Sequence, residues 1–185
     1  MAGDDKKETV HVISALVENE FGVLARIAGL FAARSFNIES LTVGPTHDPS
    51  MSRITIVVRG GATIIAQVQK QLVKLIEVIG VQDLSEGGKI IARELMFLKV
   101  DCSPENRVEL LQIGELFKAE AVDYTPGTLT FQIVGPTEKC DNFLVFMEPY
   151  GISEVARSGV VGINRGKGGL QTSIKERSAG TAKSA

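Results

Sequence analysis

The residues best placed for chemistry in this chain form a glycine turn, Asn19 to Leu24, which opens an apolar segment. A helix that begins on a glycine such as Gly22 leaves the backbone N–H groups of its first turn without partners, and those groups attract anions. A small carboxylate therefore fits this turn, although the turn brings no catalytic group. The alternative interpretation is a strand-to-helix turn that binds nothing, which is the commoner role of a single glycine turn.

Polar groups around the turn favour an amino acid as the ligand. Backbone N–H groups near Gly22, Val23 and Leu24 can receive its carboxylate. The amides of Asn19 and Asn37 both donate and accept hydrogen bonds, which suits the two charges of a zwitterion. Asn37 has an alternative role as a turn residue at the end of a helix.

Apolar residues near the same turn extend this candidate site. Leu24, Ile38 and Leu41 offer surface for an aliphatic side chain. Because one methylene changes binding by only about 1 to 3 kcal/mol, selectivity among aliphatic amino acids is expected to be loose.

The sequence contains no arrangement typical of an enzyme site. It has neither the G-x-S-x-G pattern nor a plausible Cys–His pair for nucleophilic catalysis. The segment Gly166 to Gly169 lacks the spacing of a phosphate-binding loop and is interpreted as flexible. Cys102 and Cys140 lie far apart, and His11 and His47 have no clustered carboxylates, so we predict no disulfide framework and no metal site.

Composition limits the class of protein and its partners. The chain has 185 residues, 44% hydrophobic and 23% charged, with a net charge of −2, which is typical of one globular domain or two small ones. This charge gives no reason to expect nucleic acid or an anionic membrane. Met1 to Thr9 has no apolar signal core, and no run approaches the roughly 18 apolar residues of a membrane span. We expect a cytoplasmic protein of bacterial type, with a plastid or mitochondrion as the alternative if a transit peptide was removed.

Hydrophobic periodicity predicts two copies of one βαββαβ order, that is, two tandem ferredoxin-like domains of the α+β class. The first copy is predicted to contain the strands Val10–Val17, Ile38–Val43, Ser52–Val58 and Glu77–Leu84, with helices Val23–Arg34 and Ala62–Lys74. The second is predicted to contain the strands Ile90–Asp101, Ala121–Tyr124, Thr128–Val134 and Ile152–Val155, with a helix Pro104–Ala119 capped by Ser103 and another opened by Pro136 and Thr137.

The expected boundaries follow from composition. They are an N-terminal tail over residues 1–9, a first domain over 10–85, a linker over 86–89, a second domain over 90–165 and a disordered basic tail over 166–185. Helices cover only one face of each sheet, and the strands of the first domain are apolar on both faces. The uncovered face must be buried by something, so an oligomer is expected.

Several motifs give the chain a family resemblance. Residues Glu18–Leu24, Asn37–Val43 (N-I-E-S-L-T-V), Ser52–Thr55 and Glu154–Gly162 (E-V-A-R-S-G-V-V-G) follow one another in order. From Val10 to about Gly166 the chain resembles the small regulatory subunits of acetolactate (acetohydroxyacid) synthase, whose first domain is an ACT domain. ACT folds alone occur in many metabolic regulators, and the two long motifs are more specific.

The resemblance implies a non-catalytic subunit that forms a homodimer through its ACT domains. It implies activation of a large catalytic subunit, which uses thiamine diphosphate, Mg and FAD, whereas this chain is expected to hold no cofactor. It further implies feedback inhibition by a branched-chain amino acid, usually valine, in branched-chain amino-acid biosynthesis. The effector lies between two ACT domains in that family, and its contacts would fall here on Asn19, Gly22, Val23, Leu24, Asn37 and Ile38. The alternative is a stand-alone ACT-domain amino-acid sensor that gates a different enzyme or regulator.

Two residues depart from the family pattern. Phe21 stands where the family usually has a small residue or proline, so we expect its ring either to crowd the turn or to cover the pocket. Ser35 stands where a glycine often ends the helix, and a left-handed conformation there costs a non-glycine residue about 1 to 2 kcal/mol.

Overall fold

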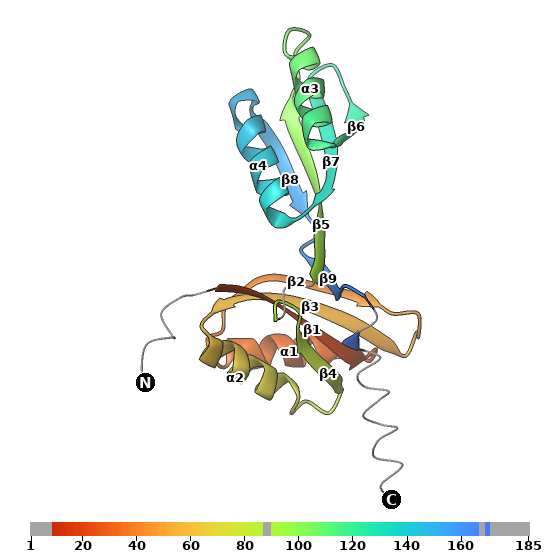
Figure 1. The fold of residues 1–185 in the computed structure, drawn as a ribbon. Helices are drawn as coiled ribbons and strands as arrows, with labels where there is room; N and C mark the ends of the chain where they lie inside the picture. Colours follow the sequence, from red (N-terminus) through yellow and green to blue (C-terminus); the bar gives the residue numbers. More distant parts are fainter. Residues whose placement is uncertain (1–8, 87–89, 167–168, 171–185) are drawn as a thin grey trace, which may run out of the picture. The chain divides into compact units, whose positions relative to one another are not determined.

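The computed structural model of the chain describes residues 9–86, 90–166 and 169–170. The described residues divide into two compact units, one made of those up to Ile91 together with those from Val161 onward, and the other of Ala92–Val160. Each unit contains an antiparallel sheet with two helices on one face (Figure 1). The predicted α+β class with two ferredoxin-like βαββαβ layouts is confirmed.

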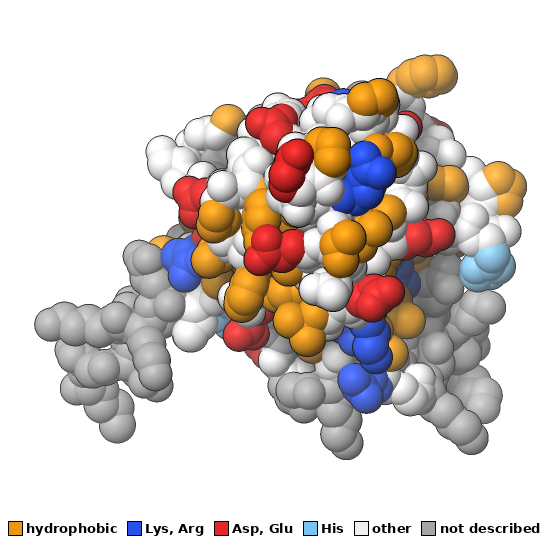
Figure 2. All heavy atoms as spheres, turned by 90° about the horizontal axis from the view of Figure 1, so that it is seen from above, with side chains coloured by type: hydrophobic (Ala, Val, Ile, Leu, Met, Phe, Trp, Pro, Cys, Tyr) orange, Lys and Arg blue, Asp and Glu red, His pale blue; other side chains and the backbone are white. Residues whose placement is uncertain are grey.

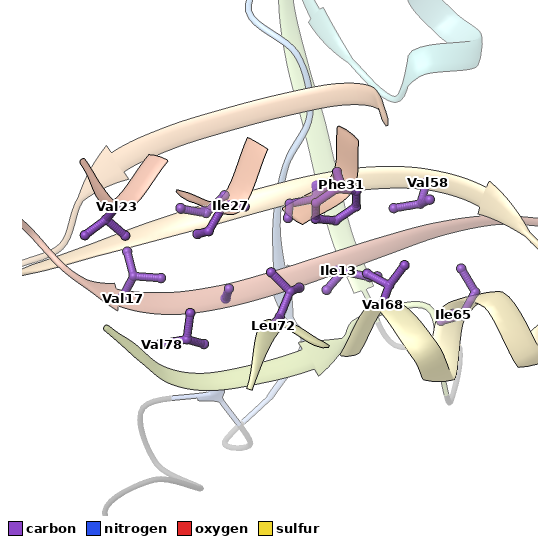
Figure 3. Close-up of a cluster of buried hydrophobic side chains, with 13 residues drawn as sticks. Ile13, Val17, Val23, Ile27, Phe31, Val58, Ile65, Val68, Leu72 and Val78 are labelled. Carbon is purple, nitrogen blue, oxygen red and sulfur yellow. The ribbon is translucent and has the colours of Figure 1, made fainter. Parts of the chain in front are cut away.

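The first unit has the strand order β2-β3-β1-β4. Its elements are β1 (Thr9–Glu18), α1 (Val23–Ala32), β2 (Ile38–Pro45), β3 (Met51–Gly60), α2 (Ala62–Leu72) and β4 (Val78–Asp83). Helices α1 and α2 pack on the face to which alternate residues of β1 and β3 point, and they bury Ile27, Phe31 and Leu72 against Ile13 and Val58 (Figure 3). This alternation of side chains is what positions the start of α1 over one end of the sheet.

Strands of the first unit are also buried on the face away from the helices, as their composition predicts. Ser14, Leu16, Thr55 and Val57 are all nearly inaccessible to solvent. Strand β9 (Val161–Asn164), which the sequence did not predict, contacts β1 in this unit.

Gly162 allows this close contact of β9. A Cβ atom at Gly162 would lie 3.1 Å from Leu84 Cδ1 and 3.4 Å from Val12 Cγ1. Residues 161–165, assigned from sequence to the second domain, therefore group with the first unit.

The second unit has the order β6-β7-β5-β8, the same topology as the first. Its elements are β5 (Ile90–Asp101), α3 (Arg107–Phe117), β6 (Glu120–Tyr124), β7 (Thr128–Gly135), α4 (Thr137–Met147), the short helix η1 (Glu148–Tyr150) and β8 (Ile152–Arg157), with Ile90 and Ile91 of β5 grouped with the first unit. Phe131 and Phe143 meet edge to face in its core, with ring centroids 5.6 Å apart. Gly114 lets α3 approach closely, because a Cβ there would be 2.6 Å from Phe131 Cε1.

Helix α3 begins later than predicted, and Ser103 is not its N-cap. The helix starts at Arg107 with Asn106 at the N-cap position. Ser103 and Asn106 bond each other across a tight turn: the Ser103 N–H donates to Asn106 Oδ1 at 2.8 Å, and the Asn106 N–H donates to Ser103 Oγ at 3.4 Å. Side chains of this kind stabilise a turn in competition with the first helical residues, so Pro104 lies in the turn.

The E-V-A-R-S-G segment has a structural role at the end of β8. Arg157 pairs with the buried Glu94 and, at 2.7 Å, with Asp141 on α4, and the Glu94 hydrogen bond raises the pKa of the guanidinium. Ser158 extends the pairing, since its N–H donates to Leu95 O at 2.9 Å and its Oγ accepts from the Leu95 N–H at 3.0 Å. Gly159 then turns the chain with a φ of 79°.

Several expected segments fall mostly outside the described residues. Of the expected tail over 166–185, the structure describes residues 166, 169 and 170, and Leu170 is buried. Residues 1–8 of the N-terminal tail and 87–89 of the expected linker also lie outside the described part.

Candidate functional site

The glycine turn lies between β1 and α1, and two backbone hydrogen bonds fix its β1 end. The Glu18 N–H donates to Glu77 O at 2.9 Å, and the Asn19 N–H donates to Ser50 O at 2.7 Å. Gly22 has φ 85° and ψ −11°, a left-handed conformation that a residue with a Cβ rarely adopts. A Cβ at Gly22 would meet nothing within 4 Å, so the requirement for glycine is conformational rather than steric.

The first turn of α1 presents backbone donors. The first bond inside the helix runs from the Arg26 N–H to Gly22 O at 3.0 Å, so the N–H groups of Val23 and Leu24 precede it and have no acceptor within the helix. Gly22 supplies no side-chain cap, and this turn contains no acidic residue. The positive end of the helix dipole adds to this preference for an anion.

Asn19 ties the glycine turn to the neighbouring loop. Its Nδ2 donates to Pro49 O, and its Oδ1 accepts from Ser52 Oγ, each at 3.0 Å. An amide has two donors and two acceptor positions, so one of each kind is left for a ligand. The sequence suggested Asn19 as a ligand residue but did not reveal this positioning role, because Pro49 and Ser52 are about thirty residues away.

Asn37 and Ile38 lie at the opposite end of α1 from Gly22. Ser35 follows α1 in the left-handed region with a φ of 55°, although it has a Cβ atom, and Asn37 comes two residues later as an exposed residue. Ile38 begins β2 opposite Val58, whereas Pro45 at the far end of β2 is opposite Ser52 and therefore near Asn19. The two ends of β2 are roughly 23 Å apart at about 3.3 Å per residue.

The structure therefore does not bring the six predicted site residues together within one chain. Asn19, Gly22, Val23 and Leu24 share one end of the unit, and Asn37 and Ile38 share the other. The side chain of Val23 is buried in the core, so only its backbone is available to a ligand.

An ion pair that the sequence did not predict fixes the direction of α1. Arg26 in the second turn pairs with Glu77, a buried residue just before β4. Since Glu77 also accepts the Glu18 N–H through its carbonyl, this contact joins the start of α1, the end of β1 and the start of β4. No spacing in the sequence marks the pair, because its members are far apart in the chain.

Other kinds of site find no support in the described residues. Among residues 9–86, 90–166 and 169–170 there is no group of three or more His, Cys, Asp and Glu side chains arranged to bind a metal ion. No helix in the described part is long and apolar enough to cross a membrane. Acidic, basic and hydrophobic side chains are intermixed on the face drawn in Figure 2, without a field of a single sign.

Comparisons with known proteins cover most of the chain. The family profile "AHAS small subunit-like ACT domain" matches residues 13–80, and "Small subunit of acetolactate synthase" matches residues 93–166. The probable acetolactate synthase small subunit of Methanothermobacter thermautotrophicus is 45% identical over 157 residues, which are 84% of this chain and 93% of that one. The chain belongs to the acetolactate synthase small-subunit family.

Further relatives agree with this family. The acetolactate synthase isozyme 3 small subunit of Escherichia coli is 44% identical over 156 residues, covering 84% of this chain and 95% of that one. The crystal structure of an acetolactate synthase small subunit from Thermotoga maritima matches with a TM-score of 0.81 and 34% identity, covering 86% of this chain and 99% of that one. The acetolactate synthase small subunit is the regulatory, non-catalytic part of its complex, so the chain is not itself an enzyme.

Proposed function

We propose that this chain activates the thiamine-diphosphate-dependent catalytic subunit of acetolactate synthase and makes it sensitive to feedback inhibition by a branched-chain amino acid, with valine as the principal effector. The two proteins would work together in the cytoplasm. The observation that carries the proposal is the open first turn of α1 at Gly22, in a chain of the acetolactate synthase small-subunit family. Its backbone donors suit the carboxylate of an amino acid.

The separation of the predicted site residues supports a site shared by two chains. Strand β2 is an edge of its sheet, and its Val43 side chain is 47% exposed. A two-fold axis through the middle of β2 would pair this edge with the same edge of a second copy in antiparallel fashion. The Asn37 end of one chain would then lie beside the Pro45 end of its partner, which is next to the partner's turn.

Each shared site would combine groups of different chemistry. One chain supplies the backbone donors of Val23 and Leu24, and the second supplies the amide of Asn37 and the apolar side chain of Ile38. The carboxylate, the ammonium group and the aliphatic side chain of the effector each find a matching partner. Two such sites form in each dimer because the axis relates them.

Effector binding at this position can alter how two ACT domains sit against each other. The effector inhibits if it binds better to an arrangement that does not activate the catalytic subunit. The coupling is reciprocal: if valine weakens association by about 1 to 3 kcal/mol, the catalytic subunit weakens valine binding equally.

The direct test is the activity of the cognate catalytic subunit, measured with increasing amounts of this chain and then titrated with valine, leucine and isoleucine. We expect the chain to raise acetolactate formation and valine to reverse the increase. Binding of valine without any change in activity would instead support a stand-alone amino-acid sensor.

A mixing experiment tests the shared site. Asn37→Ala chains keep an intact turn, and Gly22→Asp chains keep an intact Asn37, so each variant alone should bind valine poorly. After co-refolding in equal amounts, random pairing should restore about a quarter of the sites, because each mixed dimer contains one intact combination. A site contained in one chain predicts no restoration at all. Wild-type chain refolded in the same way gives the reference stoichiometry by calorimetry.

A further inference from the structure

Phe21 is the most exposed of the large hydrophobic side chains in the described part of the chain, with 105% of its reference area accessible. It directly precedes Gly22, whose left-handed backbone sets the direction in which the chain enters α1. The ring therefore does not crowd the turn within its own chain, which was one of the two expectations for this residue.

The ring has no apolar partner on its own helix. A hydrophobic residue one position before the N-cap normally packs against the fourth residue of the helix. In α1 that residue is Arg26, and its guanidinium is engaged by Glu77. Within the described residues, Phe21 takes part in no contact between aromatic rings.

The exposed ring lies next to the proposed effector site. Leu24, in the first turn of the same helix, is also 44% exposed, so two apolar side chains border the free backbone donors. An amino acid held through its carboxylate at these donors would therefore have two exposed apolar side chains close to it in the sequence. Aromatic rings bury a large area and lose little conformational freedom when they make a contact.

We propose that Phe21 is a specificity-determining residue of the effector site, whose ring covers the aliphatic side chain of the bound amino acid. The ring favours leucine, isoleucine and valine over alanine, because only the longer side chains reach it. This inference rests on the proposed function, since it requires an amino acid at Gly22.

Calorimetric titrations of the full-length chain test the role of Phe21. The proteins are wild type, Phe21→Ala, Phe21→Leu and a control, Ile76→Ala, which removes another apolar side chain that is 90% exposed in the same unit. We expect Phe21→Ala to weaken leucine and valine about tenfold and alanine less than about twofold. Phe21→Leu should recover most of the affinity, and Ile76→Ala should behave like wild type.

The outcomes separate this inference from the proposed function. Equal leucine affinity in wild type and Phe21→Ala would overturn the role of Phe21 and leave the site itself standing. A wild-type chain that binds none of the three amino acids would overturn the proposed function. A Phe21→Ala chain that sediments as a monomer where wild type sediments as a dimer would make the ring a chain-to-chain contact and would also overturn the specificity role.

Discussion

The turn that opens α1 and the turn that opens α3 occupy the same position in two copies of one topology, but they differ in the side chains around the helix start. In the first unit, Gly22 at the N-cap has a left-handed backbone and no side chain that could cap the helix. In the second, Ser103 and Asn106 satisfy each other's backbone N–H groups, and Cys102 N–H donates to Gly127 O at 2.9 Å. The turn before α3 is therefore stabilised by its own side chains, and the first turn of α3 contains the acidic Glu109.

This difference shows that the candidate site depends on the turn and not on the fold. Both units have the same strand order and pack two helices on one face of the sheet. A βαββαβ layout therefore does not by itself create a place for a ligand. The first turn of α1 is suited to the carboxylate of an amino acid because it contains no acidic side chain, whereas Glu109 already places a carboxylate in the first turn of α3.

The largest expected effect is the closure of the first turn by Gly22→Asp. The new carboxylate lies where that of the effector is expected, and charged hydrogen bonds of this kind contribute about 1.5 to 3 kcal/mol each. We therefore expect valine affinity to fall about 100-fold by calorimetry and feedback inhibition to disappear, while activation of the catalytic subunit remains. Gly22→Ala is the control, because it introduces the same backbone strain without the charge. Full valine sensitivity in Gly22→Asp would contradict the assignment of the site.

A smaller effect is expected when the second turn is opened by Ser103→Ala together with Asn106→Gly. Loss of the two hydrogen bonds should lower the free energy of unfolding by about 1 to 2 kcal/mol, measured by urea denaturation. We expect no new effector site, so the stoichiometry of valine binding should not change. A second valine per chain would show that free donors alone are enough to bind it.

Local pattern was sufficient to predict most elements of both units. Alternating residues predicted β3 around Ile54, Ile56 and Val58, and all three are buried in the first core. The spacing of Val23, Ile27 and Phe31 predicted α1, whose buried face contains these residues. Such patterns succeed because burial on one face imposes a period on the sequence.

The sequence was less informative where contacts between distant residues decide the structure. The first residue of α3 depends on a choice between two turn geometries, both of which Ser103 and Asn106 can stabilise. Strand β9 comes shortly after a serine and a glycine that are typical of an ordinary loop. The need for glycine at position 162 becomes visible only from its contact with Leu84, which is distant in the sequence. The positioning of Asn19 by Pro49 and Ser52 likewise has no signal in the spacing of the chain.

The smallest expected effects concern the opposite ends of the same two helices, where the units are alike. Ser35 after α1 and Lys118 after α3 both adopt left-handed backbone, with φ 55° and 52°. Replacing either with glycine relieves about 1 to 2 kcal/mol of strain, but glycine also adds about 0.5 to 1 kcal/mol of unfolded-state entropy. We expect each of Ser35→Gly and Lys118→Gly to stabilise the chain by about 0.5 kcal/mol in urea denaturation. Similar gains in stability at both positions would mean that the two units differ only where their helices begin. A loss of stability in Ser35→Gly alone would mean that they also differ after α1, in the segment that leads to Asn37.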